Sequence, residues 1–435
     1  MDIAIFIFYF LLFSFLISRI TFFKNSRIGG YNLIFLFLVK ILAGIAYGKF
    51  YTLPKYSAGA DTWRFYRLSL NETSWLLHHP IAFLKDLFID NYSQSGNIFS
   101  GENSYWNDLK SNVIIKLMAV MNVFTHNSYY SNTIFFNFLF LFGLVALFRV
   151  LYEIFPQKKL IIIAGIFLLP STLFWCSGIH KDGLILSATG IIIYTFNKAV
   201  RNNFSAKRIA ILILCFLAIF SLRNFVLFAL IPALISWWLS TKTHRNNFAI
   251  FGAVYTSGLI FLLIVSLIFP SVNFLAFTAN KQHEFLLLQG GSKISLPELQ
   301  PTISSFISFI PNAIDMAFFR PHLSEIKNVA YLPAFAENLL ILLLLLSSVI
   351  FLNKNVLSKP VILALLFFSI SILLLSGYTI PFTGAIVRYK SFVLPLLVTP
   401  LLCITDLSLG NRNVDNQKDS KIFDKGFIRN AKRIE

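Results

Sequence analysis

Long apolar blocks constrain the fold of this chain more than any other feature of its sequence. There are about eleven of them, each of roughly 16 to 25 residues. As helices, blocks of that length span the hydrocarbon core of a bilayer. A composition of 57% hydrophobic and only 13% charged residues agrees with a lipid environment. The sequence therefore predicts an all-α polytopic membrane protein with about eleven transmembrane helices, at residues 3–22, 31–50, 129–153, 160–178, 183–198, 207–222, 224–240, 248–269, 332–352, 360–377 and 391–408.

The net charge of +18 is spread between these blocks rather than gathered on one soluble face. This distribution argues against a nucleic-acid partner and is typical of the excess of Lys and Arg on the cytoplasmic side of membrane proteins. We expect a single transmembrane domain over residues 1–409 and a basic cytoplasmic tail over 410–435. The basic residues that mark the cytoplasmic side are Lys24 and Arg27; Lys158 and Lys159; Lys198, Arg201, Lys207 and Arg208; Lys242 and Arg245; and Lys354 and Lys359.

The first block follows Asp2 rather than a basic segment and lacks an A-x-A cleavage site. We therefore expect it to be retained rather than removed as a secretory signal. Residues 208–239 hold two short apolar stretches that meet near Arg223. A tight outer hairpin with Arg223 at its tip is the favoured interpretation, with a re-entrant pair as the alternative.

Two segments on the predicted outer side, about 51–128 and 270–331, are too long to be simple connections. Within them, Pro80–Phe88, Val113–Phe124 and Thr302–Phe319 have the pattern of amphipathic helices that lie in the headgroup plane. The three cysteines lie in or beside apolar blocks, which favours buried thiols over disulfides or metal ligands.

Asp61 is the first acidic residue on the outer side and is followed by aromatic residues. A carboxylate partly removed from water at the membrane boundary can act as a general base. The structural alternative is that Asp61 is the N-cap of a helix that starts at Thr62.

His180, Lys181 and Asp182 occupy a very short outer connection between two blocks. His180 and Lys181 are candidates for binding a phosphate at headgroup depth, with Asp182 orienting one of them. The alternative is that Lys181 extends toward the headgroups while Asp182 caps the next helix. A metal site is not predicted here, because no second histidine or carboxylate stands at ligand spacing.

Arg388 precedes the last block, where an unpaired guanidinium is costly and a phosphate or carboxylate partner is expected. Arg223 and Arg320 are further candidates for anion binding. Glu337 lies inside the ninth block, and an acid at that depth is expected to have a partner.

Taken together, these features resemble the GT-C superfamily of polytopic glycosyltransferases and the related membrane polymerases of surface polysaccharide. The residues that carry the resemblance are Asp61 with Tyr66 in the first outer segment, Lys116 to Met118, Phe124 to Asn127, Tyr152 to Pro156, the Pro-Ser-x-x-x-Trp block from Pro170 to Asp182, and Gly384 to Tyr389. The likeness covers about residues 31–200 and 378–400. Asp61 is followed by Thr62 rather than by the second acid of many members, and the extra first helix points to a polymerase-like branch.

The resemblance implies a bacterial inner-membrane enzyme that uses a polyprenyl-phosphate-linked sugar in cell-surface glycan assembly. Asp61 would be the base, with Arg388, Lys181, His180, Arg223, Arg320 and Tyr66 as substrate- or phosphate-binding residues. The partners would be the lipid-linked donor, a glycan or lipid-linked acceptor and membrane lipids. No cofactor is expected, and a requirement for a divalent metal is left open. The alternatives are an oligosaccharide-repeat polymerase, a transporter or flippase of lipid-linked glycans, and a structural partner in an assembly machine.

Overall fold

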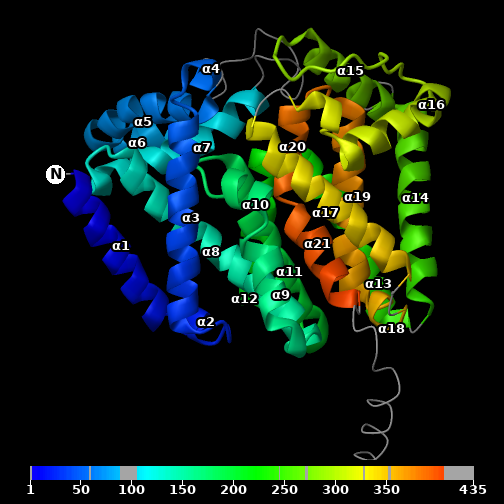
Figure 1. The fold of residues 1–435 in the computed structure, drawn as a ribbon, viewed down its shortest axis with the longest axis horizontal. Helices are drawn as coiled ribbons and strands as arrows, with labels where there is room; N and C mark the ends of the chain where they lie inside the picture. The colour runs from blue at the N-terminus through cyan, green and yellow to red at the C-terminus, as the bar shows by residue number, and fades with distance from the viewer. Residues whose placement is uncertain are drawn as a thin grey trace, which may run out of the picture.

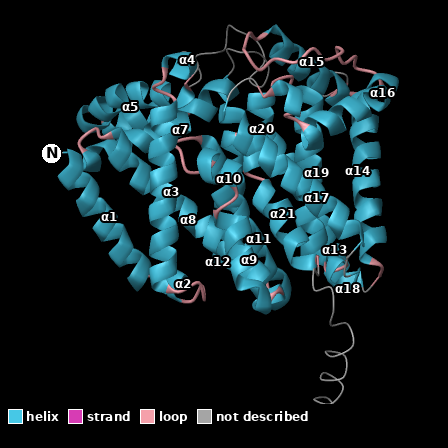
Figure 2. Cartoon of the chain, viewed as in Figure 1, coloured by secondary structure: helices cyan, strands magenta, loops and turns pink. Residues whose placement is uncertain are grey.

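The chain is a bundle of long helices with shorter helices across one end (Figure 1). This computed structural model describes residues 2–57, 60–88, 105–243, 245–269, 273–326, 329–350 and 354–405. Within these ranges the chain holds no β-strand, and one antiparallel bridge joins Lys293 to Phe382 (Figure 2). The all-α prediction is therefore confirmed. The predicted tail over 410–435 and part of the first outer segment, 89–104, lie outside the described residues.

Seven helices of the described part are long and apolar enough to cross a membrane. They are α1 (Asp2–Arg19), α3 (Gly30–Phe50), α8 (Tyr129–Ile154), α11 (Lys181–Asn202), α13 (Asn224–Thr243), α14 (Asn247–Ile268) and α19 (Pro360–Thr379). The pair α20 (Thr383–Ser391) and α21 (Leu394–Ile404) makes an eighth if it is one span with a bend of 66°. The chain thus carries the apolar helices of a membrane-embedded protein.

The other predicted blocks form helices that are too short or too interrupted to meet the same criteria of length and hydropathy. The block at 160–178 is split into α9 (Lys159–Phe167) and α10 (Pro170–Trp175), and the blocks at 207–222 and 332–352 become α12 (Ala206–Leu222) and α17 (Leu332–Ile350). Pro170 explains the split, because its ring fixes φ and removes an amide donor, so it starts a helix rather than continuing one. Arg223 is the single residue between α12 and α13.

The first outer segment forms α4 (Pro54–Ser57), α5 (Asp61–His78), α6 (Pro80–Lys85) and α7 (Tyr105–Thr125). The predicted helices at Pro80–Phe88 and Val113–Phe124 correspond to α6 and to the second half of α7. Lys116 links α7 to α5 and to the end of α6, because its Nζ lies 2.9 Å from Glu72 and 3.1 Å from Asp86. In Figure 1 these helices lie across the upper end of the bundle.

The second outer segment forms α15 (Phe274–Leu287), α16 (Ile303–Ile314) and a π-helical turn, η3 (Asp315–Phe319), followed by the short 3-10 turns η4 (Leu323–Glu325) and η5 (Val329–Tyr331). The Thr302 hydroxyl accepts from the Ser305 backbone N–H, which caps α16 at the predicted start. Two backbone hydrogen bonds, from Ile294 to Pro381 and from Thr383 to Ser292, tie the segment to the start of α20. The turns α2 (Thr21–Lys24), η1 (Pro156–Lys158) and α18 (Lys354–Leu357) lie in the remaining connections.

The core is centred on α8 and α11, whose backbones touch at Gly143 and Gly190. A Cβ on Gly190 would lie 2.2 Å from the carbonyl oxygen of Gly143, so only glycine permits this approach. All three cysteines, Cys176, Cys215 and Cys403, are buried and free, which confirms their prediction as buried thiols.

Candidate functional site

A short turn between α10 and α11 organises the polar centre of the molecule. The buried ammonium of Lys40 on α3 donates to the Cys176 carbonyl at 3.1 Å and to the Ser177 hydroxyl at 2.8 Å. The amide of Asn137 on α8 donates to the Ser177 carbonyl at 2.8 Å. Because these side chains satisfy the free carbonyls at the end of α10, the turn is held in one conformation and presents His180 at the start of α11.

His180 and Asp182 form a fully buried pair, each with a side chain that is 0% exposed. The His180 Nδ1 lies 2.7 Å from Asp182 Oδ2, and we assign the proton of the neutral ring to Nδ1 because a carboxylate can only accept. His180 occupies the N-cap position, and Asp182 lies in the first turn of α11. The sequence-based alternative that Asp182 caps this helix is therefore wrong, because its carboxylate faces the interior instead.

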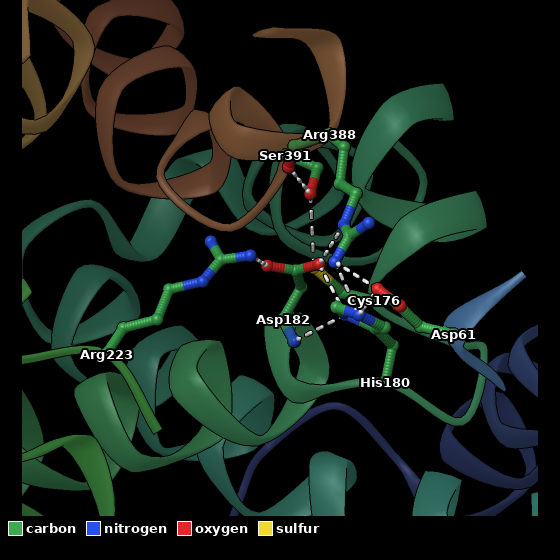
Figure 3. A network of polar contacts seen from close by, with 7 residues as sticks. All are labelled: Asp61, Cys176, His180, Asp182, Arg223, Arg388 and Ser391. Atoms are coloured by element: carbon green, nitrogen blue, oxygen red, sulfur yellow. Dashed lines mark hydrogen bonds and ion pairs between the residues drawn. The ribbon is translucent and has the colours of Figure 1, made fainter. Parts of the chain in front are cut away.

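Arg388 of α20, a helix that packs against α10, contacts both members of this pair (Figure 3). Its Nε donates to Asp182 Oδ2 at 3.1 Å, and its Nη2 lies 2.5 Å from the His180 Nε2, the nitrogen left free to accept. One hydroxyl contact fixes α20 on α10, since Thr172 donates to the Ser391 carbonyl at 2.6 Å. Within α20, the Ser391 hydroxyl donates to the Arg388 carbonyl at 2.6 Å. The expected carboxylate partner of Arg388 is thus present.

Asp61 is the accessible carboxylate of the centre, with a side chain that is 42% exposed. Its Oδ2 lies 3.5 Å from Arg388 Nη2 and 3.6 Å from His180 Nε2. Asp61 is the first residue of α5, and the N-cap position belongs to Ala60 without a side-chain cap, so the N-cap interpretation of Asp61 is wrong. Burial alone would raise the pKa of Asp61, but the positive charge of Arg388 opposes it and lowers the pKa below its usual range.

Arg223, at the junction of α12 and α13, contacts the centre at Asp182. Its side chain is 3% exposed, its Nη2 lies 2.6 Å from Asp182 Oδ1, and its guanidinium lies 4.2 Å from the ring centroid of Tyr389. The contact with Asp182 meets the distance of an ion pair but not the angles of a hydrogen bond. Within the described residues, Nη1 and Nη2 of Arg223 have no hydrogen-bond acceptor. A buried guanidinium with free donors is suited to an anionic ligand.

The centre holds two guanidinium groups and two carboxylates. Arg223 and Arg388 contact Asp182, and Arg388 also lies beside Asp61. Lys181 lies within electrostatic range of all four. Burial and the charge of Arg388 lower the pKa of His180 below its ordinary value, which keeps the ring neutral at pH 7. Because an arginine stays charged when it is buried, the two guanidinium groups supply the positive charge that an anionic ligand would need.

The two remaining sequence candidates have other partners. Arg320 lies beside Asp315 at 2.6 Å and also contacts Glu325, and its carbonyl accepts from Lys390. The Tyr66 hydroxyl donates to the Asn127 carbonyl at 2.5 Å. The structure therefore brings Asp61, His180, Lys181, Arg223 and Arg388 together and assigns Arg320 and Tyr66 to contacts that join neighbouring segments.

Sequence reasoning underestimates Asp182 and overlooks Lys40 as a support of the centre. The sequence suggests Asp182 only as an orienting or capping residue, although it contacts His180, Arg223 and Arg388. A lysine in the middle of an apolar helix, such as Lys40, is itself a signal that a buried partner exists. Glu337, which is expected to have a partner, accepts from the Ser171 backbone N–H at 3.2 Å.

Two further observations concern metal-ligand clusters and cavities. The described part of the chain contains no group of three His, Cys, Asp or Glu side chains that could hold a metal ion. An apolar groove of about 710 Å³ lies between α16, η3 and α17, and its lining includes Phe319, Phe335 and Leu342 but none of the residues of the centre.

Comparison with known proteins adds no assignment to this geometry. No protein-family model matches the chain, and no curated protein and no solved structure gives a match.

Proposed function

We propose that the chain is a membrane glycosyltransferase that moves a sugar from a polyprenyl-phosphate donor to a glycan or lipid-linked acceptor in cell-envelope polysaccharide biosynthesis. One observation carries the proposal: the half-exposed carboxylate of Asp61 lies 3.5 Å from Arg388, in a centre that also holds the buried guanidinium of Arg223. A base beside a phosphate-binding cation is what transfer from a phosphate-linked sugar requires. The resemblance of the sequence to GT-C enzymes supplies the identity of the donor.

The proposed topology has eleven membrane segments, with α9–α10, α12, α17 and α20–α21 as short or bent crossings beside the seven long helices. The protein then lies in a bacterial inner membrane with its C-terminus in the cytoplasm. Support comes from the arrangement in Figure 1, where α2 and α18, in connections rich in Lys and Arg, lie at the end opposite α5 and α20. The centre then opens to the outer side.

In the proposed reaction, the oxygen of an acceptor hydroxyl attacks the anomeric carbon of the donor sugar. The bond between that carbon and the phosphate oxygen breaks, and the phosphate leaves with the electron pair. Asp61 takes the hydroxyl proton, and the N–H groups of Arg388 stabilise the charge on the departing phosphate. Arg223, which is almost completely buried, adds its positive charge through space. His180 and Asp182 are too deeply buried to reach a substrate, so they act as positioning residues that hold the Arg388 guanidinium.

The donor itself would make Asp61 a better base. In the resting protein Arg388 holds the pKa of Asp61 low, which makes the carboxylate a weak proton acceptor. A phosphate bound to Arg388 neutralises that charge and weakens its pull on Asp61. Donor binding and base strength would then be coupled through a single guanidinium.

An oligosaccharide-repeat polymerase of the same general architecture would use the same chemistry and differs only in the acceptor. A transporter of lipid-linked glycans is less well supported. It would need charged side chains along a path through the membrane, whereas Lys40 and Glu337 are engaged by backbone or hydroxyl groups and the Arg149 guanidinium lies 4.8 Å from the Tyr194 ring centroid.

The deciding experiment mixes purified protein with radiolabelled polyprenyl-phosphate sugars and a panel of lipid-linked acceptors. We expect the label to reach an acceptor, with a loss in the Asp61→Asn variant. If label crosses the membrane of a proteoliposome without changing its chemical attachment, the transporter interpretation replaces the transferase.

A further inference from the structure

A cluster of aromatic rings lies where α3 and α10 end. The ring centroids of Tyr47 and Tyr51 are 5.0 Å apart, and Trp175 lies 5.8 Å from Tyr47 and 6.3 Å from Tyr51. Phe174 fills the space behind them, at 5.3 Å from both Tyr47 and Trp175. We call Tyr47, Tyr51, Phe174 and Trp175 the aromatic wall.

The aromatic wall lies beside the charged centre. The Tyr47 ring packs against the turn that carries His180, because a Cβ on Gly178 would lie 2.2 Å from the Tyr47 Cδ1. Burial raises the pKa of Tyr51 to about 12 against the opposing charge of Arg388, with Asp61 and Asp182 adding to the rise. Since charges act on Tyr51 from all three residues, its hydroxyl lies within electrostatic reach of the centre.

The wall is both partly open and polar at its edge. Tyr47 is 2% exposed, whereas Tyr51 and Trp175 are half-buried and keep part of their rings accessible. The Tyr51 hydroxyl and the Trp175 indole N–H can each donate a hydrogen bond to a ligand.

The planes of Tyr51 and Trp175 are tilted by 58°, so one ring can meet the face of a pyranose ring while the other borders its edge. One face of such a ring presents C–H groups that pack on an aromatic ring, and its rim carries hydroxyls that donate and accept hydrogen bonds. The cations of the adjacent centre, Arg388 first among them, would hold a phosphate linked to that sugar.

We propose that Tyr51 and Trp175 form a pyranose-binding subsite, in which the sugar of a phosphate-linked donor stacks on the Trp175 ring, borders Tyr51 at its edge and places its phosphate at Arg388. This assignment rests on the proposed function for the identity of the donor. The competing explanation is an interfacial aromatic belt, in which Trp and Tyr anchor a membrane protein at the headgroups. A belt residue affects insertion and stability, but it does not distinguish a lipid with a sugar from the same lipid without one.

The test measures that distinction directly. The full chain, in lipid nanodiscs, is titrated with polyprenyl phosphates that carry one hexose, one N-acetylhexosamine or no sugar. We expect the wild type to prefer a sugar-bearing lipid and Trp175→Ala to lose about tenfold of affinity for it, with the sugar-free lipid unaffected. Trp175→Phe, which keeps a ring, is expected to retain most of the preference.

Trp238 provides a matched control, since it is a 42% exposed tryptophan on α13 that lies outside the wall. Trp238→Ala should leave both affinities unchanged. Tyr51→Ala is the second test variant and decides the question if Trp175→Ala does not fold. Equal weakening for all lipids, or no change in either variant, would overturn the subsite.

The same titration separates the two proposals. A wild type that prefers the sugar-bearing lipid, and loses this preference in Trp175→Ala, supports the subsite even if no transfer occurs. In that case only the proposed transferase activity fails. Transfer of sugar with an unaltered preference in both wall variants would support the transferase and exclude the subsite.

Discussion

Asp182 and Arg223 form an ion pair at the centre of a membrane-embedded bundle, with Nη2 lying 2.6 Å from Oδ1 and both side chains almost completely buried. The second oxygen of Asp182, Oδ2, lies 2.7 Å from His180 Nδ1 and 3.1 Å from Arg388 Nε. One carboxylate therefore contacts two guanidinium groups and orients an imidazole. The arrangement around it depends on that single negative charge.

The first prediction concerns this charge. Asp182→Asn keeps the shape of the side chain but leaves two buried arginines without a full counter-charge, which should lower the free energy of unfolding by roughly 3 to 5 kcal/mol. In the double variant Asp182→Asn, Arg223→Met, one of the uncompensated charges is gone, so the loss should be smaller than the sum of the single losses. Denaturant unfolding in detergent measures both.

Glu153→Gln is the control, since Glu153 is 30% exposed and its pairs with Lys198 and Arg201 should contribute at most about 1 kcal/mol. An Asp182→Asn loss no larger than this would contradict the prediction.

The second prediction uses the buried histidine. Because the pKa of His180 is lower in the folded protein than in the unfolded chain, acid favours the unfolded state, which takes up the proton first. Stability should therefore rise with pH up to the unfolded pKa of about 6.5 and level off above it. The groups that face the ring are Asp61 on α5, Asp182 on α11 and Arg388 on α20, and the two carboxylates limit the effect.

Thermal unfolding of the wild type and His180→Gln at pH 5 and pH 7.5 checks this prediction. The wild type should lose more stability on acidification than the variant, by at most about 1.4 kcal/mol per pH unit. His79→Gln, which replaces an exposed histidine, should behave like the wild type. A His180→Gln variant with the same pH dependence as the wild type would contradict the prediction, because it would mean that folding leaves the pKa of His180 unchanged.

Much of the architecture could be predicted because lipid imposes a simple rule on sequence. A helix must be apolar over the length that crosses the hydrocarbon core, so the blocks at 31–50 and 129–153 appear as α3 and α8 almost without change. The break within 160–178 was harder to predict, because apolar residues continue through it and only Pro170 signals the interruption.

The centre itself could be predicted only as separate candidates. Asp61, His180 and Arg388 come from three distant parts of the sequence, and no local pattern indicates that their side chains meet. Arg320 shows the opposite case: Asp315 and Glu325 stand five residues to either side, a local signal that its charge is already paired. The sequence also could not rank Asp182 above its neighbours, since its importance comes from contacts with three separate helices or turns.

The third prediction tests the proposed topology. All native cysteines of the described chain are buried, so a single introduced cysteine should report its own side of the membrane. Gly291→Cys lies in the second outer segment, where a Cβ meets nothing within 4 Å, and Ser205→Cys lies in the exposed connection between α11 and α12. An impermeant thiol reagent should label the first in intact cells and the second only after lysis. Labelling of Ser205→Cys in intact cells would invert the topology and move the centre to the cytoplasmic side.

The fourth prediction separates catalysis from packing at Asp61. Asn has the same size, and the contacts of Asp61 at 3.5 and 3.6 Å are loose, so Asp61→Asn should change stability by less than about 1 kcal/mol. Turnover should fall by about 100-fold or more, because the amide cannot take up a proton. Asp86→Asn removes another partly exposed carboxylate from the same outer segment and should leave turnover unchanged. An active Asp61→Asn variant would remove the base from the proposed mechanism.

The last prediction concerns Arg388, which links the buried pair to the accessible carboxylate. Its guanidinium donates in several directions at once, through Nε to Asp182 and through Nη2 to His180, whereas a lysine offers one point charge. Arg388→Lys should therefore slow sugar transfer even though the charge is kept. Arg388→Ala should be worse, with a barrier higher than in the wild type by about 2 to 3 kcal/mol, the scale of losing one preorganised donor. Asp182 keeps Arg223 as a counter-charge in both variants, so folded protein should remain available for measurement.

Turnover is compared at saturating lipid-linked donor in matched amounts of folded protein. Arg320→Ala is the control. Arg320 is also a largely buried arginine, but its partners are Asp315 and Glu325 rather than residues of the centre. This variant should lower stability while leaving turnover per folded molecule at the wild-type value. If Arg388→Ala also turned over at the wild-type rate, the guanidinium would serve only to balance Asp182, and the departing phosphate would have to be stabilised by Arg223 and Lys181 alone.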